Sequence, residues 1–407
     1  MTGPRGSSLE NLSRILTLVF KDGEVSRADL ARRLKVARST VGLSVDYLVE
    51  RGILAEIDGH DGSPGRPVKA LVPGPSSATV GVVNFRQAGT QVAVSDLTGI
   101  IRAQETLDLD FGEGAEASID AAAGALRRLE KSQRASVGPL GQIVIAVPAP
   151  VDYPSGALVR STVPRELGSY PIVAWEEYPV AKQFRHLLGV ASQLENDALL
   201  FALGEAHGVG SKGLPLVRLH LSFGVGAGIV TESGAPYRGA GGTAGDIAHI
   251  APYGVTSKAV CWCGKTGCVA VVGTLRAVLD DLGISHGKGS DMLSGLDELR
   301  RRLRVGESAA TQRVWSAADA IGELAAIIVD MLNPATLVLG GEMMHLGSDV
   351  LARVRAVVYE RALPLSTRGL QITLDDFEQD GALVGGANLG AALLLSPEGV
   401  RRQLEIA

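Results

Sequence analysis

The sequence predicts an α/β protein with an N-terminal winged helix-turn-helix, a two-lobed α/β body and a structural zinc site. Three observations lead to this fold class. The first 72 residues show three helical patterns followed by two short strand patterns. The rest of the chain twice shows strands interleaved with helices, which is typical of two lobes with a cleft between them. All three cysteines lie within residues 261–268.

Composition agrees with a soluble globular protein, since 46% of the 407 residues are hydrophobic and 20% are charged. The start of the chain shows no apolar signal region, and no apolar run approaches the roughly 18–20 residues of a membrane span. We therefore expect a cytoplasmic protein. The net charge is −5, but residues 1–70 carry 11 Lys/Arg against 9 Asp/Glu. A weakly basic head on an acidic body fits a nucleic-acid-binding module.

Three helices are predicted near the start of the chain, over residues 8–20, 26–34 and 38–52. Ser8 and Ser26 are suitable N-caps, and Asp29 follows Ser26 at the spacing of a capping box. Leu9 is among the apolar residues expected to face the core, and Gly52 is expected to end the third helix. A short connection at 35–37 joins the second and third helices, as in a helix-turn-helix.

Two apolar runs, ILAEI and VKALV, follow and are joined by DGHDGSPGRP, which predicts the hairpin of a winged helix. The predicted DNA-binding residues are Lys35, Arg38, Ser39, Thr40, Arg51 and Arg66. Residues 38–40 would open the recognition helix in the major groove, and Arg66 would enter the minor groove. Lys35 and Arg51 would contact phosphates. The alternative is a three-helix domain for protein contacts, with solvated arginines.

The domain division follows from a change of pattern after PGPSSA, residues 73–78, which we interpret as a linker. Residues 1–72 form the predicted DNA-binding domain and residues 79–407 the body. Lobe 1 is expected at about 79–200 plus the C-terminal helix, and lobe 2 at about 201–385.

The cysteine spacing C-x-C-G-x-x-G-C lies twelve residues after His249. One imidazole and three thiolates, from His249, Cys261, Cys263 and Cys268, match a closed tetrahedral zinc site. Glycines within the spacing allow the tight loop that such convergence needs. A redox site and inert burial are the alternatives, although a redox site would favour C-x-x-C at a helix start.

These motifs together resemble the ROK family of repressors, open reading frames and sugar kinases. The likeness spans the whole chain, through GRP at 65–67, ENDALLFALGE at 195–205, RGAGGTAGDIAH at 238–249, the cysteine cluster and NPATLVLGGE at 333–342. The resemblance implies an actin/hexokinase-like body with structural zinc. It also implies a homodimer or homotetramer that binds sugars between its lobes.

Kinases of this family begin with a strand followed by Asp-x-Gly-Gly-Thr, where glycines let backbone amides approach phosphate. The matching stretch here is VVNFRQAGT, in which Asn84 replaces the aspartate and Arg86 and Gln87 replace the glycines. We therefore expect a transcriptional regulator of carbohydrate metabolism, most simply a repressor, without ATP-dependent catalysis. The alternative is a sugar kinase with an added DNA-binding head.

The resemblance also implies an effector site made of Asn196, Asp197, Asp246 and His249. Asp246 stands where the family has Glu, and Ala270 stands where a Glu normally follows the last cysteine. Because hydroxyl-reading sites discriminate sharply, these departures indicate either an effector other than a simple hexose or a loss of sugar binding. Asn196 and Asp197 could alternatively serve only as a cap at a strand end.

Overall fold

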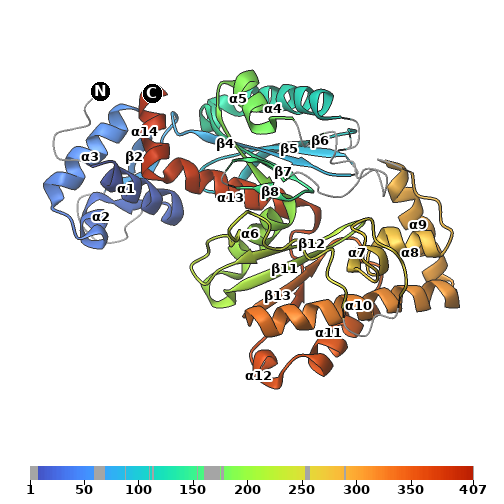
Figure 1. The fold of residues 1–407 in the computed structure, drawn as a ribbon. Helices are drawn as coiled ribbons and strands as arrows, with labels where there is room; N and C mark the ends of the chain where they lie inside the picture. Colours follow the sequence, from blue (N-terminus) through green and yellow to red (C-terminus); the bar gives the residue numbers. More distant parts are fainter. Residues whose placement is uncertain are drawn as a thin grey trace.

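The computed structural model shows an N-terminal head packed beside a two-lobed body (Figure 1). The described residues are 8–58, 69–87, 89–109, 111, 114–153, 155–159, 175, 178–252, 257–287 and 290–406. Within these ranges no single helix is long and apolar enough to cross a membrane. Only the pair of helices at 378–395 and 397–405 has the length and composition, and that pair is bent by 77°.

The head begins with three helices. They are α1 (Leu9–Asp22), α2 (Arg27–Leu34) and α3 (Arg38–Glu50). Ser8 and Ser26 accept hydrogen bonds from the backbone N–H groups of Asn11 and Asp29, at 3.2 and 3.1 Å, so the predicted N-caps are confirmed. Leu9 is 37% exposed, and the expectation that it faces the core is wrong, because the packed face of α1 begins at Leu12.

A small antiparallel sheet completes the head. Its spatial order is β1 (Val25–Ser26), β3 (Lys69–Pro73) and β2 (Leu54–Asp58). The two strands expected from the sequence are present and paired, whereas the two-residue strand β1 is too short to give a sequence pattern. The predicted turn between β2 and β3, including Arg66, lies outside the described residues.

The segment 73–78 is packed against the head. The backbone N–H of Gly74 and the hydroxyl of Ser77 both donate to the carbonyl of Ile53, each at 2.9 Å. A side chain at Gly74 would overlap with the backbone of Gly52. The connection expected to be a linker is therefore held closely against Gly52 and Ile53, between the end of α3 and the start of β2.

Lobe 1 contains a five-stranded sheet. Its order is β10 (Ala191–Asn196), β7 (Leu140–Val147), β4 (Thr79–Phe85), β5 (Thr90–Ser95) and β6 (Ile101–Leu107). Strand β7 runs parallel to β10 and to β4, whereas β5 runs antiparallel to β4 and to β6. Helices α4 (Ala115–Val137) and α5 (Val180–Leu188) cover one face with a core that includes Phe85, Trp175 and Phe184.

Lobe 2 contains a four-stranded sheet. Its order is β12 (Val225–Val230), β11 (Leu216–Leu221), β13 (Thr336–Gly340) and β14 (Gln371–Leu374). Helix α6 (Asp197–Val209) covers one face, while α10 (Ser308–Leu332), backed by α11 (Ser348–Arg361), covers the other. Four further helices contact α10: α7 (Val269–Val272), α8 (Leu275–Asp281), α9 (Ser290–Arg304) and α12 (Pro364–Thr367) (Figure 1).

Helix α13 (Gly381–Leu395) joins the two lobes by packing on α6 and on strands β4 and β7. Its sequence, GALVGGANLGAALLL, is rich in small residues because its backbone approaches its neighbours closely. A side chain at Gly385 would overlap with the carbonyl of Leu200, and one at Gly390 would overlap with Val80. The two lobes therefore share one central pair of helices.

The chain ends in α14 (Pro397–Ile406), which packs on α1 of the head (Figure 1). The hydroxyl of Ser13 donates to the carbonyl of Leu395 at 2.6 Å, and Val400 is fully buried. The apolar core of the head is continuous with that of lobe 1 through these residues. Hence the head is fixed to the body by the C-terminal helix as well as by the segment 73–78.

Candidate effector cleft and metal centre

A cavity of about 730 Å³ lies between the two lobes. One wall comes from the carboxyl ends of the parallel strands β4, β7 and β10, which is where open α/β sheets place their ligands. The other wall comes from the turn at 222–226, the loop at 238–249 and the segment after β13. The predicted effector residues all line it: Asn196, Asp197, Asp246 and His249.

Asn196 and Asp197 lie where β10 passes directly into α6. The side chain of Asn196 caps this helix by accepting from the N–H of Leu199 at 3.3 Å, and it donates to the carbonyl of Ala149 at 2.9 Å. Asp197 accepts from the N–H of Ala198 at 2.7 Å. Burial raises the pKa of Asp197 to about 7, against the opposing effect of the neighbouring backbone N–H and of Arg218. Near neutral pH this carboxyl can therefore both donate and accept hydrogen bonds.

A second charged group in the cleft was not found from the sequence. Arg238 forms a two-pronged ion pair with the buried carboxylate of Glu195, with Nη2 at 2.5 Å from Oε1. The guanidinium also lies 4.1 Å from the centre of the Tyr153 ring. Glu195 directly precedes Asn196 and Asp197, and this position was the sequence signal that could have placed it in the cleft. All three residues line the cavity, so they add a polar and aromatic rim to it.

The end of β4 has no acidic side chain directed at the cavity. Asn84 is buried and donates from Nδ2 to Oε1 of Gln91 at 3.0 Å, while Gln91 donates to Asp380 at 3.1 Å. Arg86 lines the cavity and donates to Gln379 at 3.0 Å. Burial lowers the pKa of Arg86, against the attraction of Glu342 and Asp380. Arg86 of the turn after β4 and Gln91 of β5 thus both bond to the segment before α13.

A buried network of charges lies beside this turn. Arg218 on β11 pairs with Asp375 at 2.8 Å, and their side chains are 0% and 1% exposed. Asp375 also lies 3.2 Å from Nε2 of His345. Burial, followed by the charge of Arg218, lowers the pKa of His220 to about 4, which keeps this imidazole neutral. The network was not predicted from the sequence, whose one signal for it is the arginine within the apolar strand LVRLHL.

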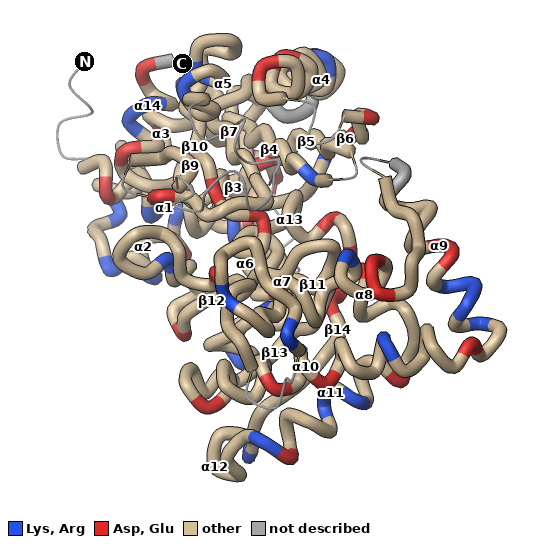
Figure 2. The backbone as a smooth tube through the Cα atoms, turned by 45° about the vertical axis from the view of Figure 1, so that its right-hand side comes forward, with Lys and Arg blue, Asp and Glu red and all other residues tan. Residues whose placement is uncertain are grey.

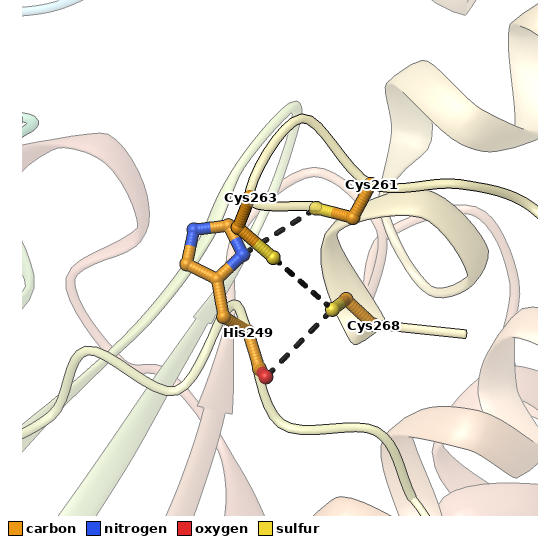
Figure 3. Close-up of side chains that lie close together, drawn as sticks. All are labelled: His249, Cys261, Cys263 and Cys268. Atoms are coloured by element: carbon orange, nitrogen blue, oxygen red, sulfur yellow. Dashed lines mark hydrogen bonds between the residues drawn. The ribbon is translucent and has the colours of Figure 1, made fainter. Parts of the chain in front are cut away.

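The histidine and the three cysteines converge on one point (Figure 3). Their ligand atoms all lie within 4.8 Å of one another, with His249 Nδ1 at 3.4 Å from Cys261 Sγ and the sulfurs of Cys263 and Cys268 at 3.6 Å. Gly264 and Gly267 adopt φ of 85° and 71°, which confirms the tight loop expected there. This group could hold a metal ion. Burial raises the pKa of the Cys268 thiol to about 12, so a thiolate there requires a nearby cation.

The predicted DNA-binding residues of the described head lie in two places. Lys35, with φ of 55°, Arg38 and Ser39 are exposed where α2 passes into α3, and Thr40 is half-buried beside them. Arg51 lies at the other end of α3 with its guanidinium 3.7 Å from the centre of the Tyr47 ring. Basic residues also gather on α2 (Figure 2). These α2 residues, Arg32 and Arg33, are not among the contacts predicted from the sequence.

Comparison with known proteins identifies the class and then the family. The fold and the cleft define a two-lobed α/β protein with an additional N-terminal head. The family model for the ROK family matches residues 87–392, and the chain belongs to the ROK family. The resemblance expected from the sequence is therefore confirmed.

Curated relatives cover nearly the whole chain. The xylose repressor of Caldicellulosiruptor bescii is 23% identical over 93% of this chain and 94% of the relative. The DNA-binding transcriptional repressor Mlc of Escherichia coli is 21% identical over 93% of this chain and 92% of the relative. The match thus extends beyond the body into the head.

Solved structures share the fold. A ROK family transcriptional regulator, described as a homologue of Escherichia coli Mlc, matches with a TM-score of 0.76 and 18% identity over 98% of this chain and 99% of that one. A ROK family glucokinase from Streptomyces griseus, in complex with glucose and AMPPNP, matches with a TM-score of 0.61 and 20% identity. It covers 77% of this chain and 99% of its own. The actin/hexokinase-like α/β body expected from the sequence is confirmed.

Proposed function

We propose that this protein is a DNA-binding transcriptional regulator, most simply a repressor of carbohydrate-metabolism genes. The observation that carries the proposal is the joining of a basic three-helix head to a ROK cleft whose first turn holds Arg86 and Gln87. Relatives named as repressors match over both parts of the chain, which supports the same function. The proposed domains are the head at 1–72, the connection at 73–78 and the body at 79–407.

The head acts in this proposal as a winged helix-turn-helix. Helix α3 is the recognition helix, with Arg38, Ser39 and Thr40 at base edges or phosphates of the major groove. Lys35 and Arg51 contact phosphates on either side, which would position the helix without reading sequence. Arg66, outside the described residues, is the proposed minor-groove contact of the wing.

The cleft is the proposed effector site, and a sugar or sugar derivative is the proposed ligand. Asn196 and Asp197 on one wall, and Asp246 and His249 on the other, offer amide, carboxyl and imidazole groups to hydroxyls in the cavity. A neutral or ionised Asp197 can pair with a hydroxyl in either direction. Binding changes DNA affinity only if the ligand prefers one arrangement of the lobes over the other.

The body is proposed to be non-catalytic. Phosphoryl transfer needs a carboxylate for the metal–nucleotide complex and amides that approach phosphate closely. Asn84 carries no charge and is bonded to Gln91, and Arg86 is bonded to Gln379. With Asn84, Arg86 and Gln87 in these positions, the turn after β4 lacks both the acid and the glycines that a kinase uses there.

Zinc is proposed as a structural ion held by His249, Cys261, Cys263 and Cys268. Zn–S bonds of about 2.3 Å in a tetrahedron place neighbouring sulfurs about 3.8 Å apart, which agrees with the 3.6 Å between Cys263 and Cys268. Four protein ligands fill the tetrahedron, so the ion would leave no site for substrate and would stabilise the loop that carries the ligands, from His249 to Cys268. Its removal should loosen the wall that carries Asp246 and His249.

A homodimer or homotetramer is proposed as the active form. Two heads would occupy half-sites on one face of the duplex, whose major groove returns every ~34–36 Å. Movement of the lobes would change the distance between the heads and hence the affinity for both half-sites together.

Two measurements test the proposal. Enrichment of random duplexes on the full-length protein should yield a recurrent, pseudo-palindromic sequence whose affinity falls with rising salt. A coupled assay with ATP and a panel of hexoses and N-acetylhexosamines should show no sugar phosphate. Steady ATP-dependent phosphorylation, or the absence of any enriched duplex, would reject the function.

A further inference from the structure

We infer that Leu43 is a sequence-reading residue that contacts the 5-methyl group of a thymine in the major groove. The inference rests on the proposed function, because it requires that α3 enters a DNA groove. Leu43 lies beyond the contacts predicted at residues 35–40, and thymine is the base that it would recognise.

Leu43 is a large apolar residue that lies exposed in the middle of a helix. Its side chain is 54% exposed, although the opposite face of α3 buries Val41, Val45 and Leu48 in the core of the head. Ser39 precedes Leu43 by four residues and therefore lies on the same face of the helix. The packing of the head does not account for a leucine at this position.

The surface around Leu43 is open to a close neighbour. A side chain added at Gly42 would meet nothing within 4 Å, and the contact that α2 makes here is from Arg27 to the backbone carbonyl of Gly42, at 3.5 Å. The helix presents a small residue and an apolar residue side by side, next to exposed Ser39 and Arg38. A duplex edge can thus reach this turn of α3 without displacing any part of the head.

Charge along the exposed face limits which turns of α3 can approach DNA. The first two turns contain Arg38 and no acidic residue, whereas Asp46 and Glu50 follow in the last two. Arg27 lies 2.6 Å from Asp46 and also pairs with Glu56 of β2, which offsets the nearer negative charge. The phosphates of DNA therefore favour entry of the N-terminal half of α3, up to and including Leu43.

The base edges of the major groove carry hydrogen-bond donors and acceptors and one apolar group. That group is the 5-methyl of thymine, so an exposed leucine among groove-facing residues selects thymine. Polar neighbours such as Ser39 can bond to either type of base edge and leave this preference to Leu43. Burial of one methyl group corresponds to about a four-fold gain in affinity.

The test compares thymine with uracil, which lacks only this methyl group. A duplex enriched on the full-length protein is synthesised with each dT replaced in turn by dU, and its dissociation constant is measured by fluorescence anisotropy at one fixed salt concentration. For at least one position in each half-site, dU should weaken binding by about four-fold. In Leu43→Ala the affinities for dT and dU at that position should become equal.

Leu9→Ala is the matched control, since Leu9 is an exposed leucine of the same head on α1. This variant should keep the four-fold preference for dT. The inference is overturned if no dT matters to the parent protein, or if Leu43→Ala keeps the preference. It is also overturned if Leu43→Ala changes the size of the assembly instead, because Leu43 would then contact protein. A protein that enriches no duplex rejects the proposed function itself.

Discussion

Asp197 couples the cleft to pH. Burial raises its pKa to about 7 from an ordinary value of 3.8, so the folded protein binds a proton that the unfolded chain has already lost. Between these two values the folded state carries more protons than the unfolded state, and the contribution of this residue to stability therefore falls as the pH rises. Above pH 7 the carboxylate is ionised in the folded protein as well, and the full free-energy cost of burying its charge lowers the stability.

Asp197→Asn should remove this dependence. Relative to the parent, the variant should gain about 2–3 kcal/mol in its free energy of unfolding between pH 5 and pH 8. Urea unfolding of both proteins across this range measures the difference, and groups common to both proteins cancel. A difference that does not change with pH would contradict a raised pKa at Asp197.

The backbone at Gly340 leaves no room for a side chain. A methyl group at this position would overlap with Nη2 of Arg218 and Oδ2 of Asp375, the buried ion pair of lobe 2. Gly340→Ala should separate the pair or displace β13 and so reduce stability by about 3–5 kcal/mol. Thermal or urea unfolding measures the loss.

Gly42→Ala is the control for that substitution. It adds the same methyl group within α3, where nothing lies within 4 Å. Its expected effect is a gain of about 0.5–1 kcal/mol, because alanine favours the helix over glycine. Similar losses in both variants would show that the ion pair is not the cause.

At the scale of elements, the described parts of the loop, residues 249–252 and 257–268, form little regular structure of their own. They include an isolated bridge between Val260 and Thr266, and convergence of four ligands on one ion would supply the missing stability. Cys263→Ser should abolish stoichiometric zinc and lower the melting temperature. Metal analysis of purified protein, together with thermal unfolding, measures both changes.

Lys265→Ala is the matched control in the same loop. Lys265 offers no ligand atom, although its backbone carbonyl accepts from the N–H of Cys261 at 2.7 Å and its charge helps to lower the pKa of Cys263. This variant should keep its zinc. Equal metal content in Cys263→Ser and the parent would exclude the proposed ligand set.

The sequence predicted elements well where the signal is local. Caps at Ser8 and Ser26, and the tight cysteine loop, depend on neighbours within a few residues, and the structure confirms them. The pairing of Arg218 with Asp375 joins residues 157 positions apart, so no local pattern reveals it. For the same reason the contacts of Arg238 with Glu195 and Tyr153 could not be predicted. The family resemblance supplied the position of the cleft residues, whose roles stay predictions.

At the scale of the whole molecule, the sequence suggested a head joined to the body only by residues 73–78. The structure shows a second attachment, because α14 packs on α1 and Ser13 bonds to Leu395. This contact spans 382 positions and carries no sequence signature. Besides the connection through residues 73–78 and β4, a chain of contacts then runs from the cleft, through the segment at 378–380, α13 and α14, to α1 of the head.

Ser13→Ala should loosen this attachment. Removing the hydroxyl leaves the carbonyl of Leu395 without its buried donor, which should destabilise the contact by about 1–2 kcal/mol. Hydrogen exchange should then quicken in α1 and α14 more than in lobe 2. Thr17→Ala is the control, since Thr17 donates only within α1, to the carbonyl of Ser13. Unchanged exchange in α1 and α14 would contradict the role of this bond.

The contact between α1 and α14 imposes an order on the synthesis and folding of the chain. The head leaves the ribosome before the body, but the apolar surface of α1 finds α14 only after residues 23–396 have been made. The part that would meet DNA is thus translated before the helix that completes its core. An unfinished chain consequently cannot occupy an operator with a fully assembled head.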